Sequence, residues 1–69
     1  MSVYQLTARE IYDTYASGIT PDQVMAQGRT TLATRLMVEE GLTEADAYYA
    51  ADQMMEHAQR IIDRNQNKD

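Results

Sequence analysis

Two stretches of the sequence, "GITPDQ" at residues 18–23 and "GLTEAD" at residues 41–46, share a pattern of glycine, an aliphatic residue, threonine, and an acid or amide three residues later. A version without the glycine, "LTARE", begins at Leu6. In a capping box, a threonine hydroxyl accepts a hydrogen bond from the first helical turn, and the later side chain reaches back to the threonine N–H. We therefore interpret the three stretches as helix starts rather than as a repeated binding motif.

The three predicted boxes differ in quality. Pro21 follows the second threonine at the first helical position, where its missing N–H costs nothing. The third box uses Asp46, whose side chain is shorter than the usual glutamate or glutamine, so we expect it to be the weakest. Gly18 and Gly41 stand where a helix commonly ends in a left-handed residue. The pairs are Thr7 with Glu10, Thr20 with Gln23 and Thr43 with Asp46.

These signals predict an all-α fold and a single domain over residues 1–69. The helices are expected at about 8–17, 21–40 and 44–65, with a polar tail at 66–69 that frays. The connection "EGLT" is short, so the second and third helices should form an antiparallel hairpin after the short first helix. Gly28 lies inside the second helix, where it either permits close approach of another helix or is a tolerated surface residue.

The third helix carries the clearest apolar pattern. Residues Ala47, Ala51, Met54, Ala58, Ile61 and Asn65 alternate in steps of four and three, which is a heptad seam. Tyr48, Met55 and Ile62 form a second line beside it, so one side can pack within the chain and the other on a second subunit. A chain of 69 residues is marginal as a monomer. We therefore predict a homodimer, with an interface made of Ala51, Met54, Met55, Ala58, Ile61 and Ile62.

Composition argues against several classes of function. The net charge of -5 disfavours binding to nucleic acid and to anionic membranes. Cysteine is absent, and the single histidine, His57, belongs to no metal-binding or catalytic motif and is expected at the boundary of the third helix. No catalytic, cofactor-binding or metal-binding residue is predicted, and the chain is not expected to be an enzyme. "MSVYQL" does not resemble a signal peptide or a membrane span, which favours a cytoplasmic protein.

Charge and aromatic residues point to a protein partner. No lysine or arginine falls between Arg35 and Arg60, whereas six acids do, and a basic surface is the natural partner of such a region. All five aromatic residues are tyrosine, a residue enriched at interfaces, and Tyr49 is the better candidate for outward display. An ordinary solvated face and an irregular core filled by tyrosine and methionine are the alternatives. The predicted partner-binding residues are Glu39, Glu40, Glu44, Tyr48, Tyr49 and Asp52.

The stretch "GRTTLATRLMVEEGLTEADAYYAADQMMEHAQRII" at residues 28–62 resembles the small, acidic, cysteine-free proteins that bacteriophages make early in infection to disable a host protein. Anti-CRISPR proteins, RNA-polymerase inhibitors and the phage quorum-sensing anti-activator belong to this group, and the last is the most similar. The resemblance implies a helical dimer in the bacterial host cytoplasm. It also implies inhibition by covering a target's DNA-binding or ATPase surface.

Two classes of function follow from the sequence. The first is an inhibitor whose acidic surface covers a basic patch on a host protein, with a transcription factor's DNA-binding domain as the favoured target. The second is a small dimeric structural or regulatory adaptor, and an anti-CRISPR-type inhibitor is a further alternative. Recovery of one dominant transcription factor or ATPase from a bacterial lysate would favour the first class.

Overall fold

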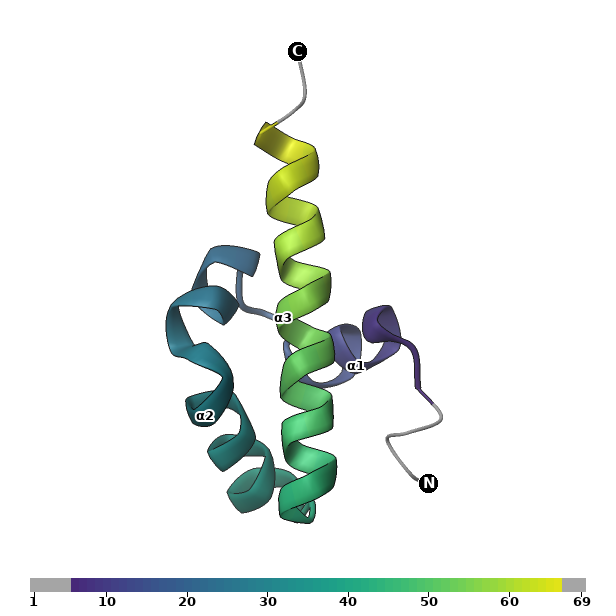
Figure 1. The fold of residues 1–69 in the computed structure, drawn as a ribbon, viewed down its shortest axis with the longest axis vertical. Helices are drawn as coiled ribbons and strands as arrows, with labels where there is room; N and C mark the ends of the chain where they lie inside the picture. Colours follow the sequence, from purple (N-terminus) through teal and green to yellow (C-terminus); the bar gives the residue numbers. More distant parts are fainter. Residues whose placement is uncertain (1–5, 67–69) are drawn as a thin grey trace.

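A computed structural model describes residues 6–66, and these form three α-helices with no strand among them (Figure 1). The helices are α1 (Ala8–Tyr15), α2 (Pro21–Glu40) and α3 (Glu44–Gln66). The all-α prediction is confirmed for this part of the chain, while Tyr4 and residues 67–69 of the tail lie outside it. No helix among the described residues has the length and apolar content needed to cross a bilayer.

The helix boundaries follow the predicted capping signals. The boxes that begin α1 and α2 are complete, with all four hydrogen bonds between 3.0 and 3.2 Å long. At the start of α3, the Asp46 N–H donates to the Thr43 hydroxyl at 3.2 Å, and within residues 6–66 the return bond from the shorter aspartate is not formed. Gly41 closes α2 in the left-handed conformation at φ 69°, as predicted.

Helix α1 ends two residues earlier than the predicted boundary at residue 17. The Ala16 N–H still donates to the Tyr12 carbonyl, but Ala16 itself leaves the helical conformation at φ -118°. Gly18, at φ 92°, then turns the chain toward α2. The left-handed glycine was therefore placed correctly, and the connection before α2 is longer than we expected.

Gly28 breaks α2, which corrects both predictions made for it. Its backbone lies at φ 83° and ψ 166°, so α2 consists of two helical segments, 21–27 and 29–40. The first segment lies at an angle to the second (Figure 1). A Cβ atom at Gly28 would meet nothing within 4 Å, so no close approach of another helix requires this glycine. The requirement comes from its backbone conformation, which residues with a side chain rarely adopt.

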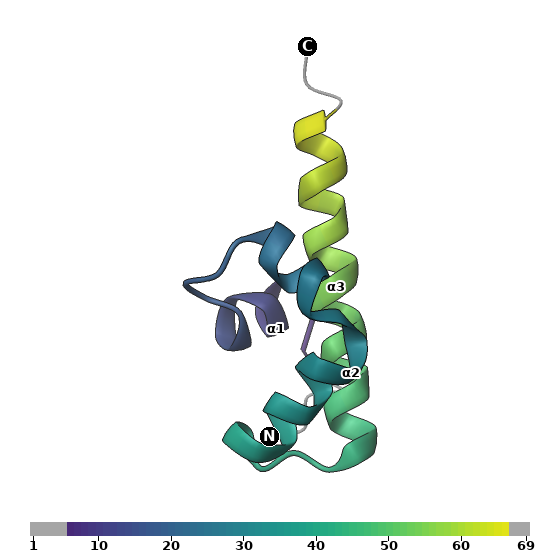
Figure 2. The same ribbon diagram turned by 90° about the vertical axis from the view of Figure 1, so that its left-hand side faces the viewer.

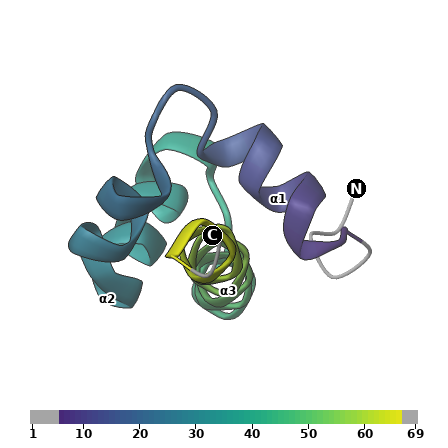
Figure 3. The same ribbon diagram turned by 90° about the horizontal axis from the view of Figure 1, so that it is seen from above.

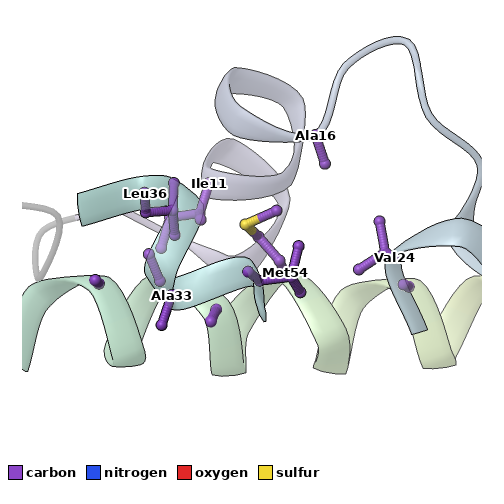
Figure 4. Packing of buried hydrophobic residues seen from close by; sticks show 11 residues of the cluster. Ile11, Ala16, Val24, Ala33, Leu36 and Met54 are labelled. Carbon is purple, nitrogen blue, oxygen red and sulfur yellow. The ribbon is translucent and has the colours of Figure 1, made fainter. Parts of the chain in front are cut away.

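Helix α3 forms the centre of the molecule. Viewed along α3, α2 lies on one side and α1 on the other, and both pack on it (Figure 3). Met54 points from α3 into the core, where Ile11 and Val24 are the other large side chains that are fully buried (Figure 4). The remaining buried residues of α3 are alanines, which allow the neighbouring backbones to approach closely.

Three of the six residues predicted to form the dimer interface are instead buried within the chain itself. Ala51, Met54 and Ala58 are at most 1% exposed, because the chain's own α1 and α2 cover this part of the heptad seam. They therefore belong to the core and offer no surface to a second subunit. The other three residues of the predicted interface, Met55, Ile61 and Ile62, are partly buried.

Candidate partner-binding surface

The Arg29 side chain extends from α2 and contacts two of the predicted site residues on α3. Its Nε atom lies 2.7 Å from the Oδ1 atom of Asp52, and its guanidinium carbon lies 4.4 Å from the ring centroid of Tyr48. The side chains of Arg29 and Asp52 are each about half exposed, so solvent screens the ion pair. Asp52 and Tyr48 are thus engaged in a contact between helices, and their role in binding a partner stays a prediction.

The sequence pattern suggested that the six acids between Arg35 and Arg60 have no basic partner. The structure contradicts this for three of them. These three acids each form an ion pair with an arginine that lies at residue 35, at residue 60 or outside this stretch of sequence. These pairs are Asp52 with Arg29 at 2.7 Å, Glu39 with Arg35 at 3.0 Å and Glu56 with Arg60 at 2.6 Å. Glu40, Glu44 and Asp46 form no ion pair with any residue in the described part of the chain.

These three acids lie at one end of the molecule, which we call the turn end and define as residues 38–46. The last turn of α2 contains no basic residue, and Glu44 and Asp46 lie in the first turn of α3. Val38, in the last turn of α2, is 78% exposed and is the one large apolar side chain so exposed within residues 6–66. The turn end therefore combines unneutralised negative charge with an exposed aliphatic side chain.

A small cavity borders the turn end. Its apolar walls come from the segment around the end of α1, from α2 and from α3, and consist of Tyr15, Ile19, Leu32, Leu36 and Met54. Three charged residues, Arg35, Glu39 and Glu40, complete its lining. The cavity volume is about 30 Å³, far below the range of about 300–1,000 Å³ that is typical of small-molecule sites. It has room for part of one side chain.

The two neighbouring tyrosines are not distinguished by exposure. Tyr48 and Tyr49 are both partly buried and both pack against the hydrophobic core. Neither tyrosine is fully buried, and the choice of Tyr49 as the better candidate for outward display stays a prediction. Helix geometry separates the two side chains by about 100°, and here both directions meet other parts of the chain.

His57 packs between helices α1 and α3. Its ring lies 5.0 Å from the ring of Tyr12 in an edge-to-face arrangement, and the Tyr12 hydroxyl donates to the Ile19 carbonyl at 3.3 Å. Burial raises the pKa of the Tyr12 phenol, and the nearby charge of Asp13 raises it further, so the phenol keeps the proton that it donates. Residues 6–66 contain no group of three histidine, aspartate or glutamate side chains placed to hold a metal ion.

The structure thus separates the six predicted partner-binding residues. Glu39 and Glu40 line the small cavity. Glu44 and Tyr48 line a shallow depression with Arg29, which also pairs with Asp52. Tyr49 packs against the hydrophobic core. Val38 and Arg29 were missed by the sequence analysis. Val38 was detectable as the last of three consecutive apolar residues, 36–38, which cannot all lie on one face of a helix. Arg29 required knowledge of how α2 lies on α3. No known protein family, curated protein or solved structure matches this chain.

Proposed function

We propose that this chain is a small, non-enzymatic binding protein of the kind that bacteriophages use to disable a host protein. In this proposal the turn end covers a basic surface on the DNA-binding domain of a transcriptional regulator. A second host target such as an ATPase fits the same chemistry. The observation that carries the proposal is that three acids of the turn end form no ion pair within residues 6–66, and that Val38 at the same end is 78% exposed.

Inhibition would follow from occupancy. The arginines and lysines with which a regulator contacts DNA phosphates also pair well with carboxylates. Glu40, Glu44 and Asp46 would occupy those cations, while Val38 removes apolar surface from water at the same contact. DNA and this protein would then compete for one surface. α3 and the second segment of α2 would act as a helical hairpin that holds the acids in place.

A reversal of charge at the turn end tests the proposal. A partner recovered from a bacterial lysate and identified by mass spectrometry should associate more slowly as salt is added, because exposed charges steer encounter within a Debye length of about 8–10 Å. Glu44→Lys should slow association further, by roughly three- to ten-fold, when binding is measured by surface plasmon resonance. DNA carrying the regulator's site should compete with binding.

Asp22→Lys is a matched control for this experiment. Asp22 and Glu44 are both exposed acids in the first turn of a helix, so the two changes have the same effect on net charge and a similar effect on the helix dipole. Only Glu44 lies at the turn end. Equal effects of the two variants, or simultaneous binding of DNA and this protein to the regulator, would refute the proposed mode of inhibition.

The proposal includes a homodimer formed through the end of α3. The last turns of α3 extend beyond α1 and α2 (Figures 1 and 2). Ile61 and Ile62 continue the apolar stripe there, and within residues 6–66 they are not among the side chains that pack against the core. Met55 is also partly buried but packs against the core, so Ile61 and Ile62 are the part of the predicted interface that remains open to a second copy.

Light scattering at micromolar concentration should therefore give about twice the mass of one chain, because a domain this small gains stability from a partner. Replacing both isoleucines with serine, Ile61→Ser with Ile62→Ser, should halve that mass without loss of helicity by circular dichroism. Val38→Ser, which removes an exposed aliphatic side chain from the other end, should leave the dimer intact. A parent chain that is monomeric and melts cooperatively would contradict the dimer.

A further inference from the structure

Gly28 separates two parts of the described chain that no ion pair among residues 6–66 joins. We call residues 6–27 the N-terminal unit. The ion pairs lie within one part or the other: Arg9 with Asp13 in the unit, and Arg29 with Asp52, Arg35 with Glu39 and Arg60 with Glu56 after Gly28. An exposed hydrogen bond from Arg35 to Gln27, 2.9 Å long, crosses the break. The unit is therefore held in place chiefly by apolar packing.

Hydrogen bonds within the N-terminal unit connect α1 to the start of α2. The Tyr12 hydroxyl donates to the Ile19 carbonyl at 3.3 Å, and the Ile19 N–H donates to the Ala16 carbonyl at 3.2 Å. The capping box at Thr20 then begins the first segment of α2. All of these bonds lie on the same side of Gly28, so α1 and the first segment can move together as one body about that residue.

The N-terminal unit supplies part of the hydrophobic core. Its residues Ile11, Ala16 and Val24 are at most 1% exposed, and α1 packs mainly on α3. Ile11 and Val24 lie in the same core as Met54, which points inward from α3 (Figure 4). If the unit left this position, Met54 and the buried alanines of α3 would face water. This face of α3 can therefore lose the unit only if an equivalent unit takes its place, and a second copy of the chain supplies one.

We propose that two copies of the chain exchange their N-terminal units, so that each unit packs on α3 of the other copy. The exchanged form repeats the apolar contacts of the closed form, including the edge-to-face contact of Tyr12 with His57 at 5.0 Å. Because the same surface is buried in both, the two forms differ mainly at the hinge. In the closed chain the hinge is Gly28 at φ 83° and ψ 166°. In the exchanged form Gly28 is helical and α2 runs without a break over residues 21–40.

Gly28 is suited to act as this hinge. Glycine adopts both the conformation of the break and that of a helix, and the segments 21–27 and 29–40 are helical already. A change at one residue therefore converts one form into the other. A continuous helix also lets backbone N–H and C=O groups on the two sides of Gly28 bond to each other. Because the first segment lies at an angle to the second, straightening of α2 carries the unit away from its own α3 (Figure 1).

Exchange leaves the proposed binding surface intact. The turn end lies entirely after Gly28, so each half of an exchanged dimer keeps its own second segment of α2, its own α3 and one turn end. Such a dimer presents two turn ends, which would strengthen binding to a target that carries two basic surfaces within reach. The inference goes beyond the proposed function and does not depend on the identity of the target. It also differs from the dimer through Ile61 and Ile62, in which every unit stays on its own chain.

The test detects whether the contact of Tyr12 with His57 forms within one chain or between two. The background is Ile61→Ser with Ile62→Ser, which removes the other proposed dimer. Isotope-labelled and unlabelled chains are mixed, unfolded in urea and refolded together at millimolar concentration. An isotope-filtered nuclear Overhauser spectrum then shows a signal from the Tyr12 ring to the His57 ring between labelled and unlabelled chains in the exchanged form, and none in the closed form. Light scattering of the same samples measures the amount of dimer.

L-Alanine and D-alanine at position 28 change the hinge in opposite directions with the same composition. L-Alanine fits the continuous helix and is strained in the break, so Gly28→Ala should raise the association constant of the exchanged dimer by at least about ten-fold. D-Alanine fits the break and is strained in a right-handed helix, so it should lower that constant by at least about ten-fold. The signal between chains should be strong in the first variant and absent in the second.

Three outcomes would overturn the inference. These are a dimer of Gly28→Ala in which the Tyr12 and His57 rings still meet within one chain, equal association of the L- and D-alanine variants, and a monomer at millimolar concentration in both. If Gly28→Ala fails to fold, the glycine chain decides: it should give the signal between chains that the D-alanine chain lacks, and a glycine chain without the signal refutes exchange. The charge-reversal experiment at Glu44 is unaffected by any of these results, so the proposed function is tested separately.

Discussion

An Ala58→Glu variant should be largely unfolded at room temperature. Ala58 is 0% exposed, and it lies on α3 where the chain's own helices cover the heptad seam. Glutamate there would be overpacked and would bury a carboxylate with no cation prepared to meet it, at a cost of several kcal/mol. A domain of this length has a free energy of unfolding of only roughly 3–10 kcal/mol. Far-UV circular dichroism and urea titration would measure the loss.

Ala45→Glu is the matched control for that prediction. Ala45 lies on the same helix but is exposed, and a negative charge near the start of α3 interacts favourably with the helix dipole. The control should therefore change the free energy of unfolding by less than about 0.5 kcal/mol. If Ala58→Glu remained helical and lost only self-association, Ala58 would belong to a subunit interface, and the core described above would be wrong.

Apolar periodicity identified the buried face of α3 but not the element that covers it. Ala51, Met54 and Ala58 were assigned to a second subunit, and the structure gives them to α1 and α2. A heptad pattern states only that a stripe must leave water, and two helices of the same chain satisfy it as well as a second copy does. Where the stripe extends beyond those helices, at Ile61 and Ile62, the original assignment stays open.

Sequence patterns that span a few residues predicted the structure better than patterns that depend on how the helices pack. Each capping box depends on atoms three residues apart, so the starts of α1 and α2 could be predicted from sequence alone. The pairing of Arg29 with Asp52 depends on how α2 lies on α3, and a count of charges between two arginines cannot detect it. The number of acids without an ion pair was therefore predicted too high, and the place of the binding surface stays a prediction. Of its residues, the structure leaves Glu40 and Glu44 without an ion pair among residues 6–66.

Gly28 shows a different limit of sequence analysis. A glycine inside a helical pattern is consistent with a continuous helix at a cost of roughly 1 kcal/mol relative to alanine. It is equally consistent with a break in which only glycine fits. The two cases have the same apolar pattern on either side, because the segment after Gly28 begins a new helix with its own buried face at Leu32, Ala33 and Leu36. The structure adopts the break, in which Val24 of the first segment packs in the hydrophobic core.

The two cases predict opposite signs for Gly28→Ala, which makes this substitution a sharp test of the break. In a continuous helix, alanine would raise the free energy of unfolding by roughly 1 kcal/mol. At the observed φ of 83° and ψ of 166°, an L-alanine is strained, and the free energy of unfolding should instead fall by about 1–3 kcal/mol. Urea denaturation followed by circular dichroism would measure the change, and its sign alone decides between the two.

A D-alanine at position 28 supplies the control, and a chain of 69 residues is short enough for chemical synthesis. The mirror image of the Gly28 conformation lies in the extended region that ordinary L-residues adopt, so D-alanine fits without strain. D-alanine should therefore raise the free energy of unfolding by about 0.4–1 kcal/mol, because it restricts the unfolded chain. Stabilisation by L-alanine and destabilisation by D-alanine would show that α2 is continuous, and the first segment would then leave its place against α3.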